Sequence, residues 1–286
     1  MAFDVATEAW LCGLTAFEMA RRLVDDDDPK SGDISARVAT DIQRFGLSLR
    51  QKLERVQIAC DDQIEFPAYY LSAGNPEICA PAVICISGEQ ETGVRLLGRL
   101  LPAVTGRGMS ILVISHDDVS TRLGVQPDML LSCCLDYVSA QPDTDATRVG
   151  VYGEGLSAAL ATDFAASDSR VAAAVCDGGL WNWARMLASV GWMTKAADVI
   201  DEDVVSRLRS RLVRQLRCPV LVVAGGRGIV SVSEAIKLQA DCVAARIDIE
   251  LAIPRMIRSP AGEIENFVSY DDCIFEWLEH KLAHRG

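Results

Sequence analysis

The chain has 286 residues, of which half are hydrophobic, and a formal net charge of -12 at pH 7. A globular chain of this length buries about 75% of the surface that it exposes when unfolded, so a large core is expected. Because there is no surplus of basic residues to neutralise phosphates, the charge argues against nucleic acid or an acidic membrane as a partner.

The N-terminal segment, residues 1–54, shows helical spacing of apolar residues over 3–24 and about 33–54. Asp4 and Glu8 stand where a secretion signal would carry positive charge, so we expect an amphipathic helix rather than a signal peptide. The acidic run between the helices, Asp25 to Asp28, could bind a cation, but four adjacent like charges repel one another and favour a solvated loop. The sequence leaves open whether these helices cap a pocket or form a homodimer interface.

From Arg55 the spacing of the apolar residues changes from that of a helix to that of a strand. "RVQIACDD" and "IEFPAYYLSAG" predict an antiparallel hairpin at the edge of a sheet. Buried strands are then expected at 82–88, 110–115, 148–153, 171–177, 218–226 and 246–253. Helices are expected at 92–104, 127–140, from 155 onward, 231–240 and 263–282. This alternation indicates an α/β fold with a mostly parallel sheet covered on both faces, spanning 55–286.

The interval 178–217 interrupts this alternation and reads as a helical lid above the carboxyl ends of the strands, where open α/β sheets bind ligands. Trp181 and Trp183 lie in it and cannot share one helix face, so at least one is expected at a lid interface or in an apolar pocket. Core packing is the alternative for both.

The ten cysteines have irregular spacing and form no CxxC pair. Several lie in or beside apolar runs, where a free cysteine behaves as a small hydrophobic residue, namely Cys60, Cys85, Cys176 and Cys218. We therefore expect reduced thiols and a cytoplasmic location. No apolar run reaches the length of a membrane span, so a soluble protein is expected.

The segments "LDYVSAQPDTDATRVGVYGEGLSAALA" (135–161) and "CPVLVVAGGRGIVSVSEAIKL" (218–238) carry a family resemblance. With the order of elements over about 55–284, they resemble the α/β-hydrolase superfamily, in particular its dienelactone-hydrolase-like and acyl-peptidase-like branch with N-terminal helices. The resemblance implies that the turn "GEGLS" corresponds to the family's G-x-S-x-G motif, which presents a nucleophile on a strained apex.

On this resemblance all three positions of a Ser-His-Asp triad are empty. Gly155 stands at the nucleophile position, and Arg227 or Gly228 stands where the acid follows the seventh strand. No histidine follows the eighth strand, since the chain holds only His116, His280 and His284. The resemblance therefore implies a degenerate triad.

Two residues could replace members of the missing triad as a nucleophile and its base. Ser157 imitates a shifted motif, but it falls two residues into the helix and no histidine is expected beside it, so we favour a packing role. His116, after the strand at 110–115, is an acid–base candidate, for which a structural hydrogen bond in the loop is the favoured interpretation.

Two carboxylates are the catalytic candidates. Asp177 ends the strand at 171–177 and is either a functional carboxylate at the pocket floor or a turn residue before the lid. Glu154 flanks the apex and is the weaker candidate. The substrate site is expected to include Gly88 and Glu89 of the loop after the first parallel strand. Further substrate contacts are expected from Gly155, Leu156, Trp181, Trp183 and Arg227.

These expectations favour non-hydrolytic chemistry of a cyclase, lyase or isomerase kind on a small carbonyl-containing metabolite, because such reactions need positioning, a carboxylate and electrostatic stabilisation. The alternatives are a non-catalytic protein that binds a ligand or partner, and an esterase or C–C hydrolase with an unusual triad. We expect neither a cofactor nor a metal ion.

Overall fold

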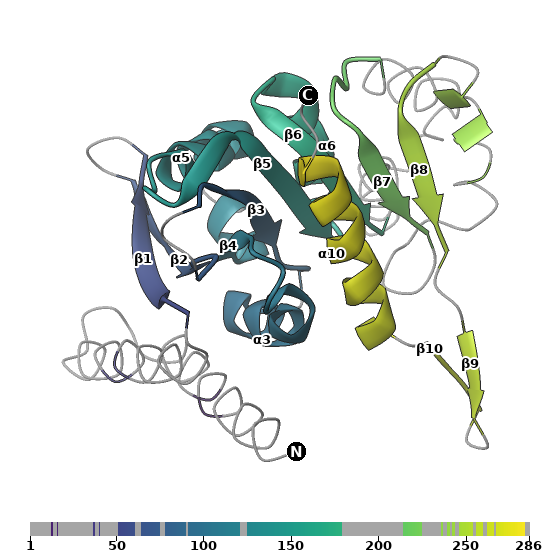
Figure 1. The fold of residues 1–286 in the computed structure, drawn as a ribbon, viewed down its shortest axis with the longest axis horizontal. Helices are drawn as coiled ribbons and strands as arrows, with labels where there is room; N and C mark the ends of the chain where they lie inside the picture. Colours follow the sequence, from purple (N-terminus) through teal and green to yellow (C-terminus); the bar gives the residue numbers. More distant parts are fainter. Residues whose placement is uncertain are drawn as a thin grey trace, which may run out of the picture.

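The computed structural model describes residues 51–178, 214–224, 246–253 and 256–283, except 61–63, 75–77, 90, 121–124, 260–261 and 266, with isolated positions elsewhere. At its centre is an eight-stranded sheet of order β1-β2-β4-β3-β5-β6-β7-β8 (Figure 1). The strands are β1 (Leu53–Ala59), β2 (Glu65–Leu71), β3 (Ala80–Ile86), β4 (Ser110–Ile114), β5 (Thr144–Glu154), β6 (Val171–Asp177), β7 (Val220–Val223) and β8 (Ile249–Ala252).

All pairings from β4 through β8 are parallel, and β1 and β2 form the antiparallel edge that the sequence predicts. Five helices are described: α3 (Gly93–Val104), α4 (His116–Ser120), α5 (Pro127–Ser139), α6 (Ser157–Ser167) and α10 (Phe267–Ala283). The prediction of a mostly parallel sheet covered by helices on both faces is confirmed.

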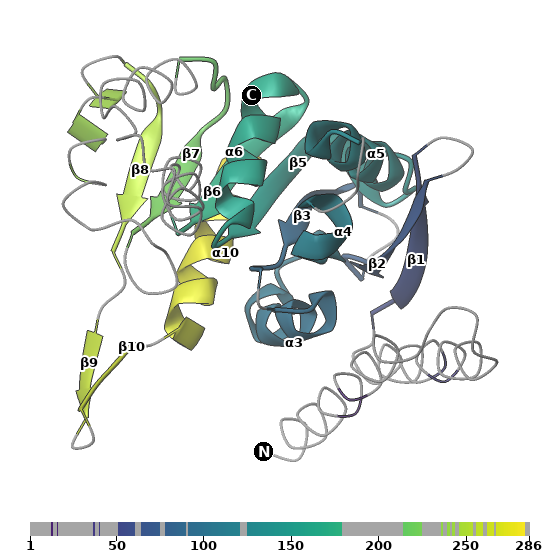
Figure 2. The same cartoon turned by 180° about the vertical axis from the view of Figure 1, so that it is seen from behind.

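Alternation along each strand decides which helices a side chain meets. Cys85 of β3 and Val175 of β6 pack in the core that α3 and α10 share with the sheet, whereas their neighbours Ile84 and Cys176 pack in the core under α5 and α6. Figures 1 and 2 show these helix pairs on opposite faces of the sheet. The same parity places Tyr152 on the α3 and α10 face.

Several boundaries differ from those predicted. The second N-terminal helix was expected to reach residue 54, but β1 already begins at Leu53, because the chain pairs with β2 from that residue on. The last helix begins at Phe267, not at 263, since 262–265 form β10 (Gly262–Glu265), which pairs with β9 (Met256–Ser259) in a separate two-stranded sheet. The N-terminal helices, the lid and most of the helix expected at 231–240 lie outside the described residues.

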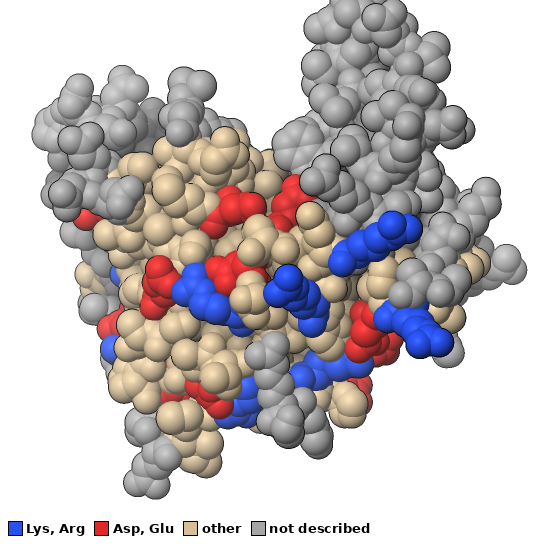
Figure 3. All heavy atoms as spheres, turned by 90° about the horizontal axis from the view of Figure 1, so that it is seen from above, with Lys and Arg blue, Asp and Glu red and all other residues tan. Residues whose placement is uncertain are grey.

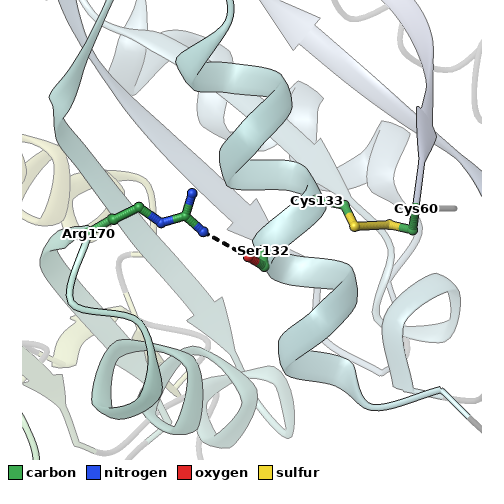
Figure 4. The surroundings of a disulfide bond; sticks show 4 residues. All are labelled: Cys60, Ser132, Cys133 and Arg170. Carbon is green, nitrogen blue, oxygen red and sulfur yellow. Dashed lines mark hydrogen bonds between the residues drawn. A yellow bond between two sulfur atoms is a disulfide. The ribbon is translucent and has the colours of Figure 1, made fainter.

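The expectation of free thiols is wrong for Cys60, which forms a disulfide with Cys133 (Figure 4). The sulfur atoms join the residue after β1 to α5 across a Cα–Cα distance of 5.6 Å, within the range that a disulfide needs. The two cysteines are 73 residues apart in the sequence. If a disulfide acts by lowering the entropy of the unfolded chain, a bridge over a loop of that length stabilises the folded protein by roughly 4 kcal/mol. The other described cysteines are free, and Cys85, Cys134, Cys176, Cys218 and Cys242 are buried.

Figure 3 looks onto the edge of the sheet where the parallel strands begin, and Lys and Arg side chains lie intermixed with Asp and Glu there. Ion pairs at this edge include Arg170 with Asp136 and Asp168. Exposed pairs of this kind contribute about 0–1 kcal/mol each. Among the described helices, none is both long and apolar enough to cross a membrane.

Candidate active site

The turn between β5 and α6 has the sharp apex that the sequence predicts. Gly155 lies at its tip with φ of 59°, a left-handed conformation that costs residues with a side chain about 1–2 kcal/mol. Its N–H donates to the carbonyl oxygen of Asp177 at 2.8 Å, which ties the apex to the end of β6. A side chain at Gly153 would collide with the backbone of Ser157, so only glycine permits this close approach of strand and helix.

The space above Gly155 is occupied by the carboxylate of Glu89. A Cβ atom built on Gly155 would lie 2.6 Å from Glu89 Oε2. The same oxygen accepts the N–H of Leu156 at 3.1 Å. Glu89 is exposed to solvent, and it lies in the loop after β3. A carboxylate from another loop thus lies over the apex, at the position where the α/β-hydrolase resemblance implies a nucleophile.

Ser157 and His116 meet on the α6 side of the apex. His116 Nδ1 lies 2.7 Å from Ser157 Oγ, and Ser157 Oγ donates to the carbonyl oxygen of Ser87 at 2.6 Å. The prediction that no histidine stands beside Ser157 is therefore wrong. The two residues meet because the sheet has the strand order β4-β3-β5, which brings the ends of these strands to the same part of the sheet edge. Ser157 is fully buried, which agrees with the packing role.

Glu154, on the other side of the apex, belongs to a partly buried ionic network. Its carboxylate contacts the guanidinium of Arg99, which also binds Asp271 of α10 at 2.8 and 2.9 Å and Glu91 at 3.2 Å. Burial lowers the pKa of Arg99, but the acidic groups around it, Tyr152 and Glu154 first, outweigh burial and raise the pKa overall. Glu154 is therefore ion-paired within the network, in which one guanidinium faces three carboxylates.

Tyr152 links this network to Asp177. Its hydroxyl lies 3.0 Å from Glu154 Oε2 and 3.2 Å from Asp177 Oδ2, and burial first, then the two carboxylates, raise the pKa of the phenol well above its usual value. A phenol has one proton, so it donates to only one of these carboxylates at a time. Asp177 is only 2% exposed. Both catalytic candidates, Glu154 and Asp177, therefore contact Tyr152 and belong to the network of side chains next to the apex.

The structure brings together eight of the predicted positions around the apex: Gly88, Glu89, His116, Glu154, Gly155, Leu156, Ser157 and Asp177. A Cβ on Gly88 would lie 3.8 Å from Glu154 Oε1, so this glycine lies against the network. Trp181, Trp183 and Arg227 lie outside the described residues, as does Gly228, the alternative position of the triad acid. The segment after β8, where the resemblance places the histidine, is described in part, as β9 and β10. The loss of the triad therefore stays a prediction.

Sequence reasoning missed Arg99, Tyr152 and Asp271. The alternation of β5 gives the only sequence signal for them, since Tyr152 and Glu154 must share a face, and two polar groups on a buried face require a partner. Within the described ranges, no three His, Cys, Asp or Glu side chains are grouped to hold a metal ion.

No protein-family model matches this sequence, and no curated protein matches it by sequence. Solved structures do match its fold. The 2,6-dihydroxy-pseudo-oxynicotine hydrolase is 20% identical with a TM-score of 0.64, over 97% of this chain and 81% of that one. An acylaminoacyl peptidase of Pyrococcus horikoshii is 14% identical with a TM-score of 0.62, over 82% of this chain but only 43% of the peptidase.

A dienelactone hydrolase from Anabaena variabilis is 16% identical with a TM-score of 0.53, over 81% of this chain and 98% of that one. At these identities the likeness concerns the fold alone. The chain has the α/β-hydrolase fold, and its structural neighbours include the dienelactone hydrolase and acyl peptidase types that the sequence resembles.

Proposed function

We propose that the protein is an enzyme that carries out non-hydrolytic proton-transfer chemistry of a cyclase, lyase or isomerase kind on a small carbonyl-containing metabolite. Glu89 is its general base. The observation that carries the proposal is the exposed Glu89 carboxylate above Gly155, held by the N–H of Leu156. A carboxylate removes a proton from a carbon next to a carbonyl group when it is held within hydrogen-bond distance of that proton.

The surroundings of Glu89 support this role. A nucleophile at the apex would collide with its carboxylate, so the two groups exclude one another at this position. The hydrogen bond from Leu156 orients the carboxylate, and the exposure of Glu89 leaves it accessible to a substrate. The names of the structural neighbours, a dienelactone hydrolase and an acyl peptidase among them, support a substrate with a carbonyl group.

One observation favours a second candidate, a hydrolase that uses Ser157 with His116 as its base. The two side chains lie within hydrogen-bond distance. However, Ser157 is fully buried and its hydroxyl already donates to the Ser87 carbonyl, so neither its oxygen nor its proton is presented to a substrate.

The test is solvent deuterium incorporation into a panel of small ketones, lactones and β-dicarbonyl compounds, followed by mass spectrometry. We expect at least one compound to gain deuterium or rearrange with the wild-type protein. This activity should fall about 100-fold or more in Glu89→Gln, as for loss of a general base. Glu276→Gln, which alters an exposed carboxylate on α10, is the matched control and should keep it.

Two results would overturn the proposal. A fluorophosphonate probe that labels the protein, with labelling lost in Ser157→Ala, would establish the hydrolase. Compounds that raise the melting temperature but return without deuterium or rearrangement would instead establish a binding protein.

A further inference from the structure

His116, Ser157 and Ser87 form a hydrogen-bonded chain whose proton positions follow from geometry. A carbonyl oxygen can only accept, so the single proton of the Ser157 hydroxyl lies toward the Ser87 carbonyl at 2.6 Å. The 2.7 Å contact between Ser157 Oγ and His116 Nδ1 then needs a proton from the histidine. His116 therefore carries its proton on Nδ1, which leaves Nε2 with a lone pair.

The surroundings of the ring hold this arrangement in place. Ser87 fixes His116 a second time, because its Oγ accepts the backbone N–H of His116 at 3.1 Å, and its own N–H donates to the end of β4 at 3.0 Å. His116 is half-buried, and within the described part of the chain its Nε2 makes no hydrogen bond. Burial lowers the pKa of the imidazole, against the opposing charges of Asp117 and Glu89.

We propose that His116 Nε2 is the second proton-transfer group of this site and that Ser157 is the positioning residue that fixes its tautomer. The inference rests on the proposed function. Nε2 accepts a proton from an O–H or N–H group of the bound substrate, and the resulting imidazolium returns that proton to the product. Glu89 returns the proton that it removes from carbon to the product in the same way, so neither group gains a net proton over the cycle. Ser157 thus orients a base, instead of attacking a substrate.

The first experiment needs no substrate. Nitrogen-15 NMR of the imidazole rings should show neutral His116 protonated on Nδ1 in the wild-type protein, with the exposed His280 as an internal reference in the same spectrum. In Ser157→Ala the tautomer equilibrium should shift toward protonation on Nε2, the tautomer that a histidine side chain prefers when its ring has no fixed partner. A wild-type His116 protonated on Nε2 would overturn the inference, because Nδ1 would then accept the Ser157 proton as in a hydrolase.

The second experiment uses the deuterium and rearrangement assay with His116→Gln. We expect a loss of about 100-fold in turnover with little change in KM. Ser157→Ala should lose less and should shift the pH profile of turnover, whereas a merely structural serine would lower activity without that shift. If turnover depends on Glu89 but is unchanged in His116→Gln, the inference fails while the proposed function stands. If turnover is unchanged in Glu89→Gln, the proposed function itself fails.

Discussion

Two glutamates flank Gly155, and the structure treats them differently. Glu154 follows β5 onto the buried face of the sheet, where Arg99 and Tyr152 bind its carboxylate. Glu89 comes from a loop, is exposed, and is held by one backbone N–H. The first carboxylate is ion-paired and only 12% of its side chain is exposed, whereas the second is exposed to solvent.

The comparison shows that a carboxylate at the end of a central strand is not thereby catalytic. Removing water from a charge requires compensating partners, and those partners satisfy the oxygen atoms that catalysis would need. The same reasoning applies to Asp177, which lies opposite Glu154 in the register of β5 and β6 and shares its Tyr152 contact. Burial of a titratable group therefore signals function only when one of its atoms is still accessible to a ligand.

The largest expected effect tests the buried side. Arg99→Met removes the cation that faces Glu91, Glu154 and Asp271, and it leaves buried negative charge uncompensated. We expect the free energy of unfolding in urea to fall by about 3–5 kcal/mol. Arg95→Met changes an exposed arginine on the same helix and should stay within about 0.5 kcal/mol of wild type. Equal effects of the two variants would show that the network does not brace the fold.

The same substitution on each side of Gly155 sharpens the contrast. Glu154→Gln weakens charge-assisted hydrogen bonds and should lower the free energy of unfolding by about 1.5–3 kcal/mol. Glu89→Gln, at an exposed position, should change it by no more than about 0.5 kcal/mol. Urea titrations of both variants at pH 7 check this. A larger loss for Glu89→Gln would mean that Glu89 is a structural residue.

The smallest expected effect concerns pH. The folded protein lowers the pKa of His116 from 6.5, because burial favours the neutral imidazole. The unfolded chain therefore binds more protons below pH 6.5, so the stability contributed by neutral His116 is present above that pH and lost as pH falls through the folded pKa. The difference in the free energy of unfolding between wild type and His116→Gln should shrink as the pH is lowered from 7.5 to 5. Parallel curves would contradict a buried, neutral His116.

Much of this architecture follows from the sequence, since the apolar strands, their alternation with helices and the glycine turn all depend on local patterns. The contact of His116 with Ser157 does not, because it depends on β3 lying between β4 and β5, an order that no local pattern encodes. The role of Arg99 could not be predicted either, because an arginine on a helix is expected to be exposed to solvent. Only the packing of the helix on the sheet brings Arg99 into contact with Glu154.

The most direct test of the central claim is the amide proton of Leu156, observed by NMR at pH 7. If the Glu89 carboxylate occupies the space above Gly155 and accepts this N–H, the amide proton should resonate downfield in wild type. In Glu89→Gln the resonance should move upfield, because a neutral amide oxygen is a weaker acceptor than a carboxylate. Gly155→Ala should move it in the same direction, because the added Cβ displaces the carboxylate. A Leu156 amide proton that is unchanged by both substitutions would contradict the account.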